Sequence, residues 1–120
     1  MKRSTDGIRI FIVEDDLIYA KTLRYMMTLN PDHDVRVFSN GRDCINQMHL
    51  KPHIVSLDYT LPDMMGNEVF KEIKRLSPET KVIVVSGQED VGTAIEMYRQ
   101  GVEEYITKEE ASRNIIFNAI

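Results

Sequence analysis

The chain has one cysteine, no tryptophan and four prolines among 120 residues. Because Cys44 has no partner for an internal disulfide, we expect a reducing compartment, the cytoplasm, and a fold held by its core. No apolar run approaches the ~20 residues that cross a bilayer. Residues 1–7 lack the apolar segment of a secretory signal. These absences exclude a disulfide scaffold and predict no membrane contact.

Positive charge is also scarce, with 15 Lys and Arg against 19 Asp and Glu and a net charge of −4. Nucleic-acid surfaces normally carry a basic patch, so we expect none in this domain. Hydrophobic residues make up 42% and charged residues 28%, which is typical of globular proteins. A chain of this length suits one domain. We therefore predict a single domain over residues 1–120, with an ordered core over 7–120.

Short β-branched runs alternate along the chain with longer amphipathic segments, and no repeat or low-complexity tract interrupts them. This alternation predicts an α/β fold with a parallel sheet and right-handed crossovers. Most of the runs are nearly continuous in apolar residues, as in strands covered on both faces. The pattern alone leaves the strand order open. The expected strands are residues 8–13, 34–38, 53–57, 81–85 and 104–107, and the expected helices are 17–29, 42–50, 67–76, 90–100 and 109–120.

Polar side chains follow four of the five expected strands. In open α/β sheets, ligands bind beyond the carboxyl ends of the strands. Carboxylates that meet there repel one another unless a cation lies between them. Mg²⁺ is the natural candidate, because it binds carboxylates, water and phosphate at the same time. A lysine and a hydroxyl can hold phosphoryl oxygens, and a carboxylate can form an acyl phosphate. The pattern indicates phosphoryl transfer, and the residues concerned are Glu14, Asp15, Asp58, Ser86 and Lys108.

Each of these residues also has an ordinary structural interpretation. Residues 14–16 fit an acidic turn in which Asp16 is the N-cap of the next helix. Asp58 fits a plain loop acid, and Lys108 fits a solvated lysine. The joint occurrence of complementary groups at four strand ends favours the functional interpretation.

Four segments, IFIVEDD, IVSLDYTLPDMMGNEVFKEIK, VIVVSGQED and GVEEYITKEE, resemble the receiver domain of two-component response regulators. The resemblance extends from residue 8 to about residue 120. It implies a doubly wound, flavodoxin-like, five-stranded parallel sheet in the order 2-1-3-4-5. It further implies a phosphorelay switch rather than an enzyme, with a sensor histidine kinase or a histidine phosphotransfer protein as partner. A stand-alone receiver and one cut from a longer regulator both stay open.

The resemblance assigns a role to each candidate residue. Asp58 matches the aspartate that accepts the phosphoryl group. Lys108 matches the lysine that holds a phosphoryl oxygen, and Ser86 with Tyr105 matches the switch pair. The Mg²⁺ ligands that it implies are Glu14, Asp15, Asp58 and the backbone carbonyl of Tyr59. It leaves open a homodimer through the face formed by the fourth helix, fifth strand and fifth helix.

The sequence departs from the family after the lysine, where Glu109 replaces a proline that is usually joined by a cis bond. A cis bond before a non-proline residue costs ~3–4 kcal/mol, against ~0.5–1 kcal/mol before proline. We therefore expect a trans Lys108–Glu109 bond and a rearranged loop. Glu109 and Glu110 also place negative charge near Lys108, which is expected to weaken its hold on phosphate.

Two alternatives remain from the sequence. One is a magnesium-dependent hydrolase with a nucleophilic aspartate, but that motif carries a second acid two residues later, where this chain has Thr60. The other is a receiver-like interaction module that never uses phosphate. The intact Asp58 and Lys108 argue against the module, while the missing proline keeps it open.

Overall fold

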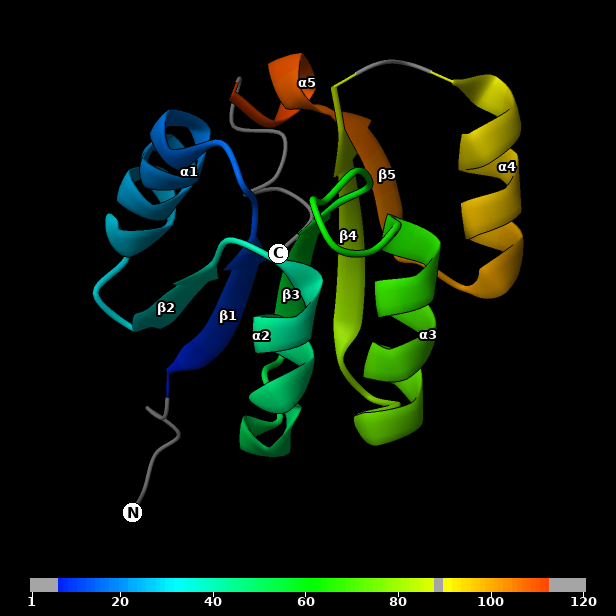
Figure 1. Cartoon of the computed structure of the whole chain (residues 1–120). Coiled ribbons are helices and arrows are strands. Elements are labelled where there is room, and N and C mark those ends of the chain that lie inside the picture. The colour runs from blue at the N-terminus through cyan, green and yellow to red at the C-terminus, as the bar shows by residue number, and fades with distance from the viewer. Residues whose placement is uncertain (1–6, 88–89, 113–120) are drawn as a thin grey trace.

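A computed structural model describes residues 7–87 and 90–112. It contains one five-stranded, all-parallel sheet in the order β2-β1-β3-β4-β5 (Figure 1). The doubly wound α/β fold and its strand order are therefore confirmed. The strands are β1 (Ile8–Val13), β2 (His33–Phe38), β3 (Ile54–Asp58), β4 (Lys81–Ser86) and β5 (Glu104–Thr107).

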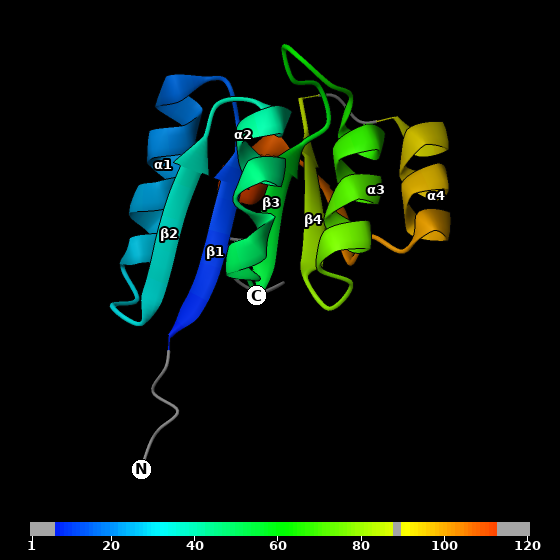
Figure 2. The ribbon, with the colours of Figure 1, turned by 60° about the horizontal axis from the view of Figure 1, so that its bottom comes forward.

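Helices cover both faces of the sheet, because successive side chains of a strand point to opposite faces. Phe11 and Val13 pack in one core with residues of α2, α3 and α4, whereas Ile10 and Ile12 pack in the other with residues of α1 and α5. In Figure 2, α2 and α3 lie in front of the sheet and α5 lies behind it. The helices are α1 (Leu17–Thr28), α2 (Gly41–Asn46), α3 (Gly66–Leu76), α4 (Val91–Gln100) and α5 (Lys108–Ser112), with a 3₁₀ turn, η1, at Met48–Leu50.

The predicted helix over residues 42–50 is wrong in its second half. α2 ends at Asn46, and a separate 3₁₀ turn follows. The tighter turn buries Met48 completely and leaves His49 exposed, although an α-helix would have placed both on one face. The predicted last helix matches α5 as far as Ser112, and its residues 113–120 lie outside the described residues.

The single cysteine lies inside the fold. Cys44 lies in α2 as a free, fully buried cysteine, and burial raises the pKa of its thiol to about 12. Within residues 7–87 and 90–112, no helix combines the length and apolar composition that a bilayer crossing needs.

Candidate functional site

The sheet order brings the predicted site residues together at the carboxyl ends of the strands. β3 lies between β1 and β4, with Val13 beside Leu57 and Asp58 beside Val85. Glu14 and Asp15 therefore emerge next to the end of β3. A pocket of about 500 Å³ opens there, and its lining includes Asp15, Asp58, Tyr59, Ser86, Tyr105 and Lys108.

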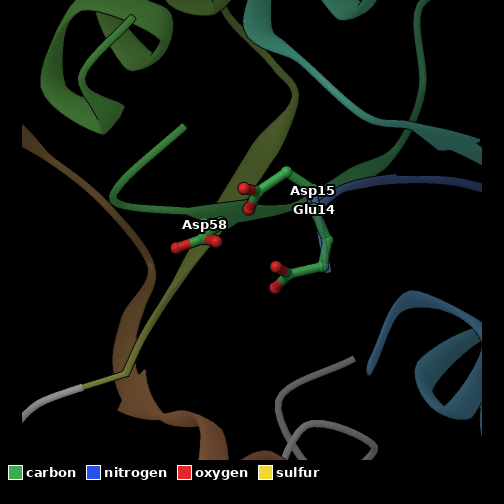
Figure 3. A group of neighbouring side chains, drawn as sticks. All are labelled: Glu14, Asp15 and Asp58. Carbon is green, nitrogen blue, oxygen red and sulfur yellow. The ribbon is translucent and has the colours of Figure 1, made fainter. Parts of the chain in front are cut away.

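Three carboxylates form the centre of this site (Figure 3). One oxygen of each, from Glu14, Asp15 and Asp58, lies within 4.8 Å of the other two. Glu14 is 2% exposed and Asp58 is 5% exposed, whereas Asp15 reaches solvent. A set of hard oxygen donors with one open side fits a hydrated Mg²⁺ ion, which typically binds one or two carboxylates and keeps several waters.

Lys108 supplies the positive charge at this site. Its Nζ lies 3.0 Å from Glu14 Oε2 and 3.5 Å from Asp58 Oδ2. Burial alone lowers the pKa of Lys108, but the hydrogen bond to Glu14 and the charges of Asp58 and Glu14 outweigh it, so the net pKa lies above its ordinary value. The side chain therefore stays an ammonium that bridges two buried carboxylates.

The pKa of Glu14 is strongly shifted from its ordinary value. Burial raises its pKa to about 7; the hydrogen bond from Lys108 opposes this rise, and the neighbouring Asp58 adds to it. The backbone N–H of Asp16 also donates to Glu14 Oε2 at 3.1 Å. In the absence of a metal ion, the Glu14 carboxyl thus holds its proton more tightly than an ordinary glutamate does.

Asp16 has the structural role that residues 14–16 also allowed. Its Oδ1 accepts hydrogen bonds from the backbone N–H groups of Ile18 and Tyr19, both at 3.1 Å. This is N-cap geometry for α1. The three consecutive acids therefore have different roles: Asp16 caps α1, whereas Glu14 and Asp15 belong to the site.

The loop after Asp58 is fixed by backbone hydrogen bonds. Thr60 N donates to Asp58 Oδ1 at 3.1 Å, and Gly66 N donates to the Tyr59 carbonyl at 2.6 Å. The Tyr59 carbonyl thus has one lone pair committed to Gly66, and its role as a metal ligand stays a prediction. A Cβ at residue 66 would lie 2.7 Å from Tyr59 Cα, so the close approach requires glycine.

We expect Gly66→Ala to lower the free energy of unfolding by ~1–3 kcal/mol, because the added methyl displaces backbone at the start of α3. Gly92→Ala is the matched control: its Cβ would meet only Asp90 Oδ1, at an ordinary 3.5 Å, inside α4. Alanine there should raise stability by ~0.5–1 kcal/mol through helix propensity. Urea denaturation measures both, and equal midpoints for Gly66→Ala and wild type would contradict the expectation.

The chain enters α5 without a loop, so the predicted rearranged loop after β5 is wrong. Thr107 N donates to Glu110 Oε1 at 3.0 Å, and Glu110 N donates to Thr107 Oγ1 at 3.1 Å. This reciprocal pair is a capping box, and it starts the helix at Lys108. The described residues contain no cis peptide bond, so the predicted trans Lys108–Glu109 bond is confirmed. The Thr-x-x-Glu spacing in the sequence was the signal for this cap.

Two further residues support the site and were missed from the sequence. The Asp63 carboxylate accepts from the backbone N–H groups of Gly41 and Arg42, both at 2.9 Å, which ties the loop after β3 to the start of α2. The Tyr19 hydroxyl donates to the Lys108 carbonyl at 2.8 Å. Both contacts join segments that are far apart in the sequence, so no local pattern indicates them.

The predicted switch residues lie on neighbouring strands at the edge of the pocket. Ser86 ends β4 and pairs with Thr107 of β5, and both Ser86 and Tyr105 are half-buried. Tyr105 lines this pocket and also a second one of about 310 Å³ beside α4. Its backbone N–H donates to the Tyr98 hydroxyl at 3.0 Å. Tyr105 thus lies between the site and the surface of α4.

Comparisons with known proteins agree with this geometry. Residues 10–119 match the family model of the response regulator receiver domain. The chain is 32% identical over 103 residues to the chemotaxis protein CheY of Thermotoga maritima, which covers 85% of this chain and 86% of that protein. It is 31% identical over 117 residues, 94% of this chain, to a protein-glutamate methylesterase/protein-glutamine glutaminase of the same organism, but spans about a third (34%) of that longer protein.

A solved structure supports the same assignment at the level of the fold. The CheY-like receiver domain from Methanospirillum hungatei superposes with a TM-score of 0.83 at 22% identity, over 93% of this chain and 90% of that one. The matched family model spans nearly all of the sequence, including each of the strand ends that form the pocket. The chain therefore belongs to the receiver-domain family of two-component response regulators.

Proposed function

We propose that this domain acts in the cytoplasm and that Asp58 accepts a phosphoryl group from the phosphohistidine of a sensor histidine kinase or a histidine phosphotransfer protein, in a reaction that requires Mg²⁺. The observation that carries this proposal is the position of the Lys108 ammonium, which contacts both Glu14 and Asp58 at the carboxyl ends of the strands. Family membership supports a signalling role, because receiver domains act with histidine kinases.

In the proposed reaction, an oxygen of the Asp58 carboxylate attacks phosphorus, the P–N bond breaks, and the imidazole leaves with the bonding electrons. Thr60 N and Lys108 Nζ each contact one oxygen of that carboxylate, so its orientation is set before the donor arrives. Lys108 and the Ser86 hydroxyl then face the phosphoryl oxygens, whose charge they stabilise. The protein contributes positioning and electrostatics, as expected for phosphoryl transfer.

Glu14, Asp15 and Asp58 would hold the Mg²⁺ ion, together with a backbone carbonyl and water. The ion would neutralise charge on the transferring group. The Tyr59 carbonyl remains one candidate, although it already accepts from Gly66. Thr60 also lines the pocket, so its backbone carbonyl is the alternative candidate.

The direct test is incubation with acetyl phosphate and Mg²⁺, followed by intact mass spectrometry. We expect the mass to rise by one phosphoryl group, and EDTA to abolish the gain. A wild-type protein that stays unmodified with several small donors and with a cognate kinase would favour the phosphate-independent interaction module. Multiple turnover of a small phosphoester would favour the hydrolase.

Metal affinity should depend on pH through Glu14. Burial raises the pKa of Glu14 to about 7 in the metal-free protein, so a cation must displace a proton below that pH. We expect the apparent affinity for Mg²⁺ or Mn²⁺ to fall about tenfold per pH unit below pH 7 and to level off above it. Titration calorimetry from about pH 5.5 to about pH 8, a range on both sides of the Glu14 pKa, measures this affinity. Glu14→Gln should flatten the profile, and an unchanged slope would contradict the linkage.

We further propose that Ser86 and Tyr105 carry the phosphorylation signal to the face formed by α4, β5 and α5. Val91, Ile95 and Tyr98 are 65%, 48% and 46% exposed on α4 and line the groove beside Tyr105. This apolar exposure supports the face as a docking surface, with a second copy of the chain as one partner. The acidic net charge supports the absence of a nucleic-acid partner for this domain.

A further inference from the structure

Tyr19 of α1 contacts Lys108 at both ends of that residue. Its hydroxyl donates to the Lys108 backbone carbonyl at 2.8 Å, and its ring lies 5.0 Å from Lys108 Nζ, within cation–π range. Tyr19 is half-buried and packs against the core shared by α1 and α5. A single side chain, 89 residues away in the sequence, therefore touches the backbone and the ammonium of the same lysine.

The lysine needs such support. A free lysine side chain has four flexible bonds and carries ~2 kcal/mol of rotamer entropy. Glu109 follows Lys108 where a proline ring would otherwise restrict the backbone. The carboxylates of Glu14 and Asp58 contact Nζ at 3.0 and 3.5 Å, and the Tyr19 ring adds a third contact with the same ammonium.

We infer that Tyr19 is a positioning residue that fixes Lys108, through its hydroxyl at the backbone and its ring at the ammonium, in the place where Lys108 meets the phosphoryl group. This inference rests on the proposed function for the identity of the group that Lys108 holds. The hydroxyl is a reliable donor at neutral pH, because burial and the charges of Glu14 and Asp58 raise the pKa of Tyr19 above its ordinary value.

Two substitutions separate the contacts. Tyr19→Phe keeps the ring and removes the hydroxyl, whereas Tyr19→Leu removes both. We expect Tyr19→Phe to slow phosphorylation by acetyl phosphate and Mg²⁺ by about three- to tenfold, the effect of one hydrogen bond, and Tyr19→Leu to slow it further. Tyr25→Phe on the same helix is the matched control, since Tyr25 is 68% exposed, and it should leave the rate unchanged.

Repeating Tyr19→Phe in a Lys108→Met background distinguishes positioning from support of the fold. Methionine keeps the backbone carbonyl that Tyr19 binds and removes the ammonium. If Tyr19 acts through the ammonium, Tyr19→Phe should change the residual phosphorylation rate by less than about twofold there, even though it still lowers stability in urea. The same several-fold loss in both backgrounds, or a wild-type rate for Tyr19→Phe, would overturn the inference.

A readout without phosphate separates this inference from the proposed function. In NMR spectra of protein with labelled lysine, the ring current of Tyr19 should shift the Lys108 ε-CH₂ protons upfield in wild type and in Tyr19→Phe, but not in a folded Tyr19→Leu protein. Unshifted Lys108 protons in wild type would overturn the inference. Wild type that shows the shift but gains no phosphoryl group would overturn the proposed function while leaving Tyr19 as the residue that fixes Lys108.

Discussion

Asp58→Asn should abolish the phosphoryl gain that we expect of wild type with acetyl phosphate and Mg²⁺. An amide oxygen is far less nucleophilic than a carboxylate, and asparagine also removes one of the three carboxylates at the candidate cation site. The shape is nearly unchanged, and the carbonyl oxygen of asparagine can still accept from Thr60 N. Loss of modification would therefore report the chemistry of residue 58 and not a collapse of the loop. Intact mass spectrometry under identical conditions measures it.

Asp16→Asn is the control for removing an acid near the site. Asparagine caps helices as well as aspartate does, so α1 should keep its start. Asp16 uses its carboxylate on Ile18 and Tyr19 and not on the cation site. This variant should be phosphorylated at nearly the wild-type rate. Modification of Asp58→Asn at a comparable rate would instead place the phosphoryl group on another residue.

Lys108→Met should destabilise the metal-free protein, and more at pH 8 than at pH 5. The substitution leaves Glu14, 2% exposed, without its cation. Breaking a buried ion pair costs ~3–5 kcal/mol, and because Lys108 is 26% exposed we expect about 2–4 kcal/mol at pH 8. Urea denaturation in EDTA at both pH values measures the difference.

The direction of this pH dependence follows from Glu14. Its pKa in the folded protein is about 7, above the ordinary 4.5, so the folded state binds the proton more tightly than the unfolded state. The stabilising effect of that proton is complete below about pH 4.5 and is lost as the pH rises through 7. Without Lys108 the folded pKa rises further, since Lys108 lowers it, and protonation at pH 5 removes most of the uncompensated charge.

Lys71→Met provides the matched control, because Lys71 is exposed on α3. A surface substitution of this kind should change stability by less than about 0.5 kcal/mol at either pH. Equal losses for Lys108→Met at pH 5 and pH 8 would show that the cost comes from lost packing and not from the charge on Glu14.

Much of the fold could be predicted from the sequence because its signals are local. The apolar runs that became β1, β3 and β4 are buried on both faces, so continuous hydrophobicity was enough to find them. β2 begins at His33, one residue before its predicted start, because His33 pairs with Ile8 of β1. That boundary depends on a neighbouring strand, and the same reason explains why pattern alone left the strand order open.

The candidate site divides in the same way. Glu14, Asp15, Asp58 and Lys108 could be placed at strand ends because each follows an apolar run, and the sheet order then brings them together. The contact between Tyr19 and Lys108 could not be predicted in this way, because it joins two residues that meet only in the folded chain. Tyr19 reads as an ordinary helix residue until Lys108 lies beside it.

Thr107 holds two positions at once, since it is the last residue of β5, opposite Ser86, and the cap of α5. Sheet and helix therefore share one residue as their joint. A shift of Ser86 at the end of β4 would pass through its pairing with Thr107 to the first turn of α5, with no flexible link to absorb the movement. Lengthening this joint by an inserted glycine would uncouple the tilt of the last helix from events in the pocket.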